Sequence, residues 1–166
     1  MTTEGGLDVK AMMGKLEEAT RKLQSVQTSV SYFIDPSEEL VAVSKECGAD
    51  AVEFHTGRYA NLFLAINTNI QKTHHRIDLL GDNRAWQTSE LASELELIKK
   101  CASFARDMGL FVAAGHGLNY QNVTAISEIK EIEELNIGQS IVARSVFVGF
   151  ERAVREMKEL ICKNQK

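Results

Sequence analysis

Apolar residues recur every three or four positions over the first part of the chain, and this spacing predicts an amphipathic helix over 8–26. The stripe consists of Val9, Met13, Leu16, Ala19, Leu23 and Val26. The same spacing predicts helices over about 37–47 and 88–108. It also predicts one long amphipathic helix that runs from Val142 to Ile161.

Four short apolar runs, bounded by Gly, Asp or Pro, predict β-strands between these helices. They lie near 29–34, 50–54, 110–114 and 134–138. Because each strand is followed by a helix, the chain consists of βα units, which form a parallel sheet covered by helices. The predicted fold class is therefore α/β. Four βα units are half of a (β/α)₈ barrel, which takes roughly 250 residues.

The segment 61–86 interrupts this alternation because it has no sustained hydrophobic period. We expect a long excursion with a short helix inside; such excursions serve as lids, partner-binding loops or disordered insertions. His74 and His75 lie within it, but adjacent side chains diverge and no third ligand stands at metal-ligand spacing. The sequence therefore predicts no metal site.

Composition and charge narrow the class of protein. The 166 residues include 19 Lys and Arg against 23 Asp and Glu, and 44% are hydrophobic, as in a soluble globular domain. The formal charge is -4, and no basic run is present. We expect neither nucleic acid nor an anionic membrane surface as a partner.

Cysteine usage and the N-terminal sequence bear on the compartment. Cys47, Cys101 and Cys162 form no CxxC pair and lie in apolar or amphipathic stretches, so we expect buried, reduced thiols. The N-terminal segment has no basic and apolar pattern of a signal peptide, and no apolar run approaches the roughly 18 residues of a membrane span. The expected location is the cytoplasm.

Polar residues at strand ends are the candidates for chemistry, because ligands of parallel α/β folds gather there. His116 stands between Gly115 and Gly117 directly after a predicted strand. This position leaves room for a ligand, and imidazole exchanges protons near neutral pH. The alternative is a turn histidine with a structural hydrogen bond.

Two further candidates follow other strands. Glu53 alternates with Val52 and Phe54, so it lies on the opposite face of its strand, either as a catalytic carboxylate or in a structural ion pair. Gly138-Gln139-Ser140 stands between a strand and a helix, where backbone N–H groups bind phosphate. Equally, Ser140 could only cap its helix.

Five segments together resemble the pyridoxine 5'-phosphate synthase (PdxJ) family. These are TTEGGLDV at 2–9, VSYFIDP at 30–36, GADAVEFHTGRYA at 48–60, AAGHGLNYQNV at 113–123 and IEELNIGQSIVARSVFVGFERAVREMK at 132–158. The resemblance covers nearly the whole chain except 61–86. It implies a TIM (β/α)₈ barrel with added helices, here a partial barrel of about four βα units. It also implies a homo-oligomer without metal or organic cofactor.

The implied reaction condenses 1-deoxy-D-xylulose 5-phosphate with 3-amino-2-oxopropyl phosphate, closes the pyridine ring and releases inorganic phosphate. By resemblance, His116 is the proton donor and Glu53 stabilises the transition state. Gly117 and Gly138 match positions that bind the amino-ketone phosphate. Thr2 matches a threonine that contacts the deoxyxylulose phosphate.

The sequence departs from the family pattern at two of the matched positions. Gln139 stands where the family usually has His, and its amide can still donate to a phosphate oxygen but cannot carry a proton. Ala113 stands where the family usually has Asn, which removes a polar group beside the expected site.

The resemblance begins about midway along the family sequence, at a position where Met1 replaces the usual valine. We therefore expect residues 1–166 to be the C-terminal half of a synthase barrel, with an atypical insertion at about 61–86. The absent half carries the family's catalytic bases. The alternative hypothesis is a non-catalytic remnant or a phosphate-binding half-barrel module.

Overall fold

The computed structural model describes residues 5–162, which fold into two compact units. The first unit consists of the chain up to His55 together with Leu97–Gly115 and Ile129–Asn136. The second consists of Thr56–Glu96, His116–Glu128 and the segment from Ile137 onward.

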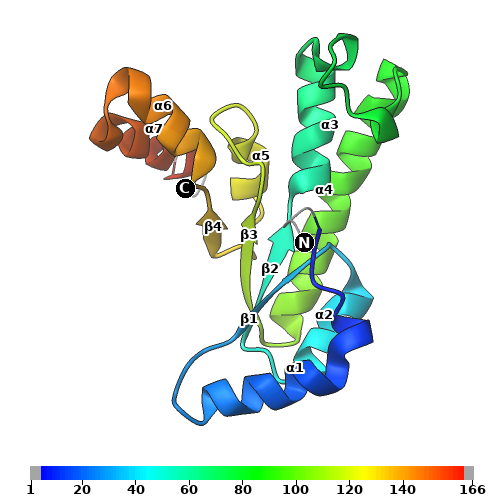
Figure 1. The fold of residues 1–166 in the computed structure, drawn as a ribbon, viewed down its shortest axis with the longest axis vertical. Helices are drawn as coiled ribbons and strands as arrows, with labels where there is room; N and C mark the ends of the chain where they lie inside the picture. The colour runs from blue at the N-terminus through cyan, green and yellow to red at the C-terminus, as the bar shows by residue number, and fades with distance from the viewer. Residues whose placement is uncertain (1–4, 163–166) are drawn as a thin grey trace. The chain divides into compact units, whose positions relative to one another are not determined.

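A parallel four-stranded sheet forms the centre of the first unit (Figure 1). Its strands are β1 (Ser31–Ile34), β2 (Ala51–His55), β3 (Phe111–Gly115) and β4 (Glu134–Asn136), in the spatial order β1-β2-β3-β4. Every neighbouring pair is parallel. The predicted α/β class and the four parallel strands are confirmed, and the sheet is that of a partial (β/α)₈ barrel.

The two faces of this sheet differ in chemistry because side chains alternate along each strand. One face is apolar and buried, and it carries Tyr32, Ile34, Val52, Phe54, Val112 and Ala114. The opposite face, here called the Glu53 face, carries Phe33, Glu53, His55, Ala113, Gly115 and Asn136. The polar side chains on the Glu53 face are therefore the candidates for a site on this sheet.

Helices α1 (Val9–Gln24), α2 (Glu38–Glu46) and the later part of α4 (Arg84–Asp107) complete the first unit. The Asp8 side chain caps α1 by accepting the N–H of Ala11. The hydroxyls of Thr20 and Tyr32 lie 2.6 Å apart in a buried hydrogen bond, so α1 packs on the apolar face of β1. These helix bounds agree with the sequence prediction to within a few residues.

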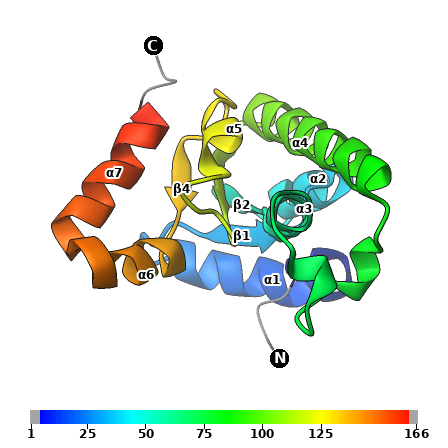
Figure 2. The same ribbon diagram turned by 90° about the horizontal axis from the view of Figure 1, so that it is seen from above.

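The predicted single helix from Val142 to Ile161 is wrong, because the second unit has two helices there. They are α6 (Gln139–Val148) and α7 (Phe150–Cys162), and Figure 2 shows them meeting at an angle. Gly149 between them has a φ of 84°, which helical residues do not adopt. Its N–H makes the last hydrogen bond of α6, to the carbonyl of Ser145, and its positive φ then turns the chain out of the helix.

The expectation for 61–86 also needs correction, since much of that segment is helical. Helix α3 (Gly57–Asn67) covers its beginning and α4 starts at Arg84. Two short 3₁₀ turns, η1 (Ile70–Lys72) and η2 (Asp78–Leu80), lie between these helices. The hydrophobic period is lost only over 68–83, where short backbone turns and the side chain of Gln71 take the place of a regular helix or strand.

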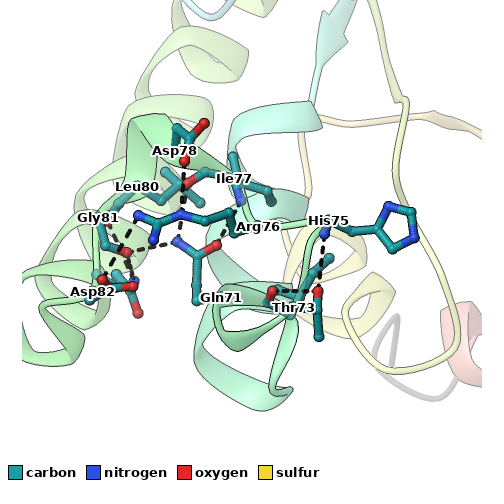
Figure 3. A network of polar contacts seen from close by, with 11 residues as sticks. Gln71, Thr73, His75, Arg76, Ile77, Asp78, Leu80, Gly81 and Asp82 are labelled. Atoms are coloured by element: carbon teal, nitrogen blue, oxygen red, sulfur yellow. Dashed lines mark hydrogen bonds and ion pairs between the residues drawn. The ribbon is translucent and has the colours of Figure 1, made fainter.

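Gln71 organises that loop (Figure 3). Its amide nitrogen donates to the carbonyls of Ile77 at 3.1 Å and Gly81 at 2.7 Å, and its oxygen accepts the N–H of Ile77 at 2.7 Å. Behind this network, Leu80 packs in a small apolar cluster with Leu62 and Ala65 of α3. The loop therefore has a defined fold of its own.

Replacing Gln71 by alanine is expected to destabilise this loop by about 1–3 kcal/mol, because half-buried backbone groups lose their partners. Urea unfolding of the purified chain measures the difference. Lys72→Ala is the matched control, since that neighbouring side chain is exposed and belongs to the same 3₁₀ turn. Equal stability of the two variants would contradict the role assigned to Gln71.

The thiols and the membrane prediction can be checked in the described part of the chain. Cys47 and Cys101 are buried, as expected, and neither forms a disulfide within residues 5–162, but Cys162 is exposed because it lies at the last position of α7. None of the helices within residues 5–162 is long and apolar enough to cross a bilayer.

Candidate functional site

The first part of the candidate site lies where the four strands end. His55, Gly115 and Asn136 are the last residues of β2, β3 and β4, and Asp35 directly follows β1. In parallel barrels this edge of the sheet holds the ligand. The strand-end polar residues of the first unit therefore lie on the edge that the sequence analysis singled out.

Glu53 occupies the middle of the Glu53 face. It is half-buried on β2, in register with Phe33 of β1 and Ala113 of β3. Burial raises the pKa of its carboxyl group; a hydrogen bond from Asn136 opposes this shift and the charge of Glu134 adds to it. A carboxyl group with a raised pKa holds its proton closer to neutral pH, as acid–base residues do.

Gly115 shows how closely the backbone approaches this carboxyl group. A Cβ atom at Gly115 would collide with Oε1 of Glu53 and would lie 3.0 Å from the Cβ of Asn136. Only glycine therefore leaves the carboxyl group in its place. Gly115 was expected to leave open space beside His116, but in the structure its missing side chain makes room for the Glu53 carboxyl group.

Asp35, which directly follows β1, and His55, the last residue of β2, form a polar pair at neighbouring strand ends. Nδ1 of His55 lies 2.9 Å from Oδ1 of Asp35, and the same oxygen accepts the N–H of Gly6 at 3.2 Å. The adjacent Leu7 N–H donates to the carbonyl of Phe33 at 2.7 Å. The pair thus ties the Gly5-Gly6 turn to the end of β1. Only their shared strand-end position signals this in the sequence.

The second part of the site lies in the second unit, at His116 and Gly117. Both residues are exposed and have left-handed backbone, with φ of 79° and 81°. The Thr56 hydroxyl donates to the His116 carbonyl at 2.7 Å. His116 thus occupies a tight turn beside the start of α3.

The loop that follows His116 is anchored to α6 and α7 of the same unit. The hydroxyl of Ser140 donates to the carbonyl of Leu118 at 2.9 Å. The hydroxyl of Tyr120 donates to the carbonyl of Ala153 at 2.7 Å. The guanidinium of Arg144 lies 5.1 Å from the centre of the Tyr120 ring. Ser140 therefore bonds to the His116 loop and does not cap α6, so that alternative is wrong.

Gly138 and Gln139 stand at the start of α6. Gly138 is the N-cap, has no side chain to cap the helix, and has open space where a Cβ would point. Gln139 is the exposed first residue of the helix. The backbone N–H groups of this first turn form the type of end that binds anions.

The site residues predicted from the sequence fall into two groups, one in each compact unit. Glu53 belongs to the first unit, whereas His116, Gly117, Gly138 and Gln139 belong to the second. Their convergence on one ligand stays a prediction, and Thr2 lies outside the described residues. Ala113 is the register partner of Glu53, so the position at which the family usually carries Asn adjoins that carboxylate.

A parallel sheet of βα units with polar groups at its carboxyl edge is typical of barrel enzymes. Comparison with known proteins identifies the family within this class. A family model described as "Pyridoxal phosphate biosynthesis protein PdxJ" matches residues 1–163, so the chain belongs to the PdxJ family.

Individual relatives agree with the family match. The chain is 53% identical to the pyridoxine 5'-phosphate synthase of Campylobacter fetus over 161 residues. It is 48% identical to the synthase of Aliarcobacter butzleri over the same number of residues. Both matches cover 97% of this chain but only 62% of the relative's length.

Proposed function

We propose that this chain forms part of a pyridoxine 5'-phosphate synthase. The reaction joins 1-deoxy-D-xylulose 5-phosphate to 3-amino-2-oxopropyl phosphate, closes the pyridine ring and releases inorganic phosphate. The observation that carries the proposal is the family match over residues 1–163 together with polar strand ends around Glu53. In this reading, residues 1–166 are the C-terminal half of a barrel, with 61–86 as an insertion.

The proposed chemistry assigns a task to each part of the site. Ring closure needs proton transfers at a carbinolamine and at an enol, and an exposed imidazole at His116 suits a proton donor. The carboxyl group of Glu53 suits stabilisation of charge that develops during these steps. Its raised pKa, caused mainly by burial, supports this role.

Two phosphate groups also need anchors. The first turn of α6, with Gly138 and Gln139, offers backbone N–H groups and an amide donor to the amino-ketone phosphate. The exposed backbone of Gly117 is assigned to the same substrate. Thr2 is assigned to the deoxyxylulose phosphate.

The proposal includes the oligomeric state and the cellular compartment of the whole protein. Family resemblance supports a homo-oligomer. Two buried cysteines that form no disulfide in the described part of the chain, Cys47 and Cys101, support the cytoplasm as the compartment. No metal or organic cofactor is assigned to the reaction.

A chimera tests the proposed function. The 161 matching residues of the Campylobacter fetus synthase are replaced by those of this chain, so that the relative supplies the remaining 38% of its length. We expect purified chimera to form pyridoxine 5'-phosphate and inorganic phosphate only when both substrates are present. A folded chimera that makes no product would overturn the proposal.

A binding role without turnover is the second candidate. The observation that favours it is Gln139, an exposed amide at the α6 N-terminus that donates hydrogen bonds but does not titrate. For this candidate, NMR titration of the 166-residue chain with 3-amino-2-oxopropyl phosphate or inorganic phosphate would shift the signals of Gly138 and Gln139. The chimera would remain inactive.

A further inference from the structure

The turn at His116 has a backbone conformation that its own residue disfavours. Among residues 5–162, only His116 and Gln27 have a positive φ without being glycine. Left-handed backbone strains a residue that has a Cβ, so it persists only where the surroundings hold it. The next residue, Gly117, continues the left-handed turn. Buried side chains of the second unit hold the carbonyls of these two residues.

Thr56 is the first of these groups. It occupies the N-cap position of α3, where a threonine hydroxyl normally accepts an N–H of the helix. Here it makes no such capping bond and instead donates to the carbonyl of His116 at 2.7 Å. The side chain is fully buried. The hydroxyl is thus used on the turn and not on its own helix.

Asn122 holds the next peptide. Its amide nitrogen donates to the carbonyl of Gly117 at 3.1 Å, while its oxygen accepts the N–H of Asn119 at 2.7 Å. Only 2% of Asn122 is exposed. Both ends of this buried amide are therefore engaged in keeping the loop closed.

Tyr59 of α3 in turn fixes the backbone of Asn122. Its hydroxyl donates to the Asn122 carbonyl at 2.8 Å. Burial raises the pKa of Tyr59 to about 12, so the hydroxyl keeps its proton and remains a donor at any working pH. This bond links the loop to the same helix that carries Thr56.

Close packing adds a steric limit to these hydrogen bonds. A Cβ atom at Gly117 would lie 2.6 Å from the Cβ of Ala60, one turn along α3 from Thr56. The turn therefore lies directly on α3. It has little freedom to move toward the helix.

We propose that Thr56 and Asn122 are positioning residues for the imidazole of His116. They fix the left-handed turn from which that side chain projects, and they act through His116. The proposal rests on the proposed function for the role of His116 as proton donor. The hydrogen bonds themselves do not depend on that role.

Thr56→Val in the chimera is the first test, because valine keeps the branched shape and removes the hydroxyl. We expect turnover to fall by about 10²-fold, the loss typical of a displaced catalytic group, with little change in KM for either substrate. Thr56→Ser restores the hydroxyl and should recover most of the turnover. An unchanged turnover in a folded Thr56→Val variant would overturn the proposal.

Thr20→Val is the matched control. Thr20 is also buried and loses one buried hydroxyl bond, but its partner is Tyr32 on the sheet. We expect it to lower the melting temperature as Thr56→Val does while turnover stays near that of the chimera. If Thr56→Val fails to fold, Tyr59→Phe carries the test, with a smaller loss of turnover expected.

NMR of the 166-residue chain separates this proposal from the proposed function. The chain has four histidines, and His116→Asn assigns the signals of His116. Thr56→Val or Tyr59→Phe should shift the backbone and ring signals of His116 and leave those of His74 and His75 in place. Unmoved His116 signals would overturn the positioning role, whereas moved signals with an inactive chimera would overturn only the proposed function.

Discussion

Replacing His116 by asparagine is expected to lower turnover of the chimera by about 10²-fold to 10⁴-fold, the range for a lost acid–base group. Asparagine suits this test because it tolerates left-handed backbone better than most residues, and His116 has a φ of 79°. The fold of the turn should therefore survive the change. Steady-state kinetics with both phosphorylated substrates measures the loss.

His75→Asn is the matched control for this variant. His75 is exposed in the loop between α3 and α4, where its backbone N–H bonds to the Thr73 hydroxyl. We expect turnover to be unchanged. Equal rates for the two histidine variants would show that His116 takes no part in proton transfer.

Replacing Glu53 by glutamine is expected to move activity and stability in opposite directions. Turnover should fall by about 10²-fold or more, because the amide cannot stabilise positive charge or exchange a proton. Stability at neutral pH should rise, since burial disfavours the ionised carboxylate and so raises the pKa of Glu53 in the folded chain.

The pH dependence of this stability difference follows from the direction of the shift. Below the ordinary carboxyl pKa, Glu53 is protonated in both folded and unfolded chains, and the two proteins should be equally stable. As pH rises through the raised pKa of the folded state, the wild type loses stability that the variant keeps. Urea unfolding at pH 4 and pH 8 tests this. The exposed Glu96→Gln is the control.

Local patterns were sufficient to predict the sheet and the face of Glu53. Alternation places Glu53 opposite to Val52 and Phe54, and the structure finds both apolar neighbours fully buried while Glu53 is half-buried. Gly115 and Gly117 also stand where a glycine is required, but for different reasons. One makes room for a carboxylate and the other lies against α3.

Features that depend on distant partners could not be predicted in the same way. Hydrophobic spacing continues across Gly149, because Val146, Phe150 and Val154 keep a four-residue interval, so the break between α6 and α7 leaves no periodic signal. The pairing of Asp35 with His55 joins residues from two strand ends, and no local pattern records it.

The loop over 68–83 escaped prediction for a related reason. Its backbone polar groups bond partly to one another in short turns and partly to the amide of Gln71, so neither a helical nor a strand period appears. The same holds for Thr56, whose hydroxyl bonds to His116 sixty residues away. From the sequence alone, a threonine directly before a helix is interpreted as an ordinary N-cap.

The order of the strands has a consequence for how the chain folds. Each strand pairs with the next one along the chain, so the sheet can grow in the order in which the polypeptide is synthesised. The chain segments that must close to pair the strands differ in length. Residues 35–50 separate β1 from β2, whereas residues 56–110 separate β2 from β3. The longer closure costs about 1 kcal/mol more chain entropy. Pulsed hydrogen exchange during refolding should therefore protect the β1–β2 amides before those that join β2 to β3, and simultaneous protection would contradict this order.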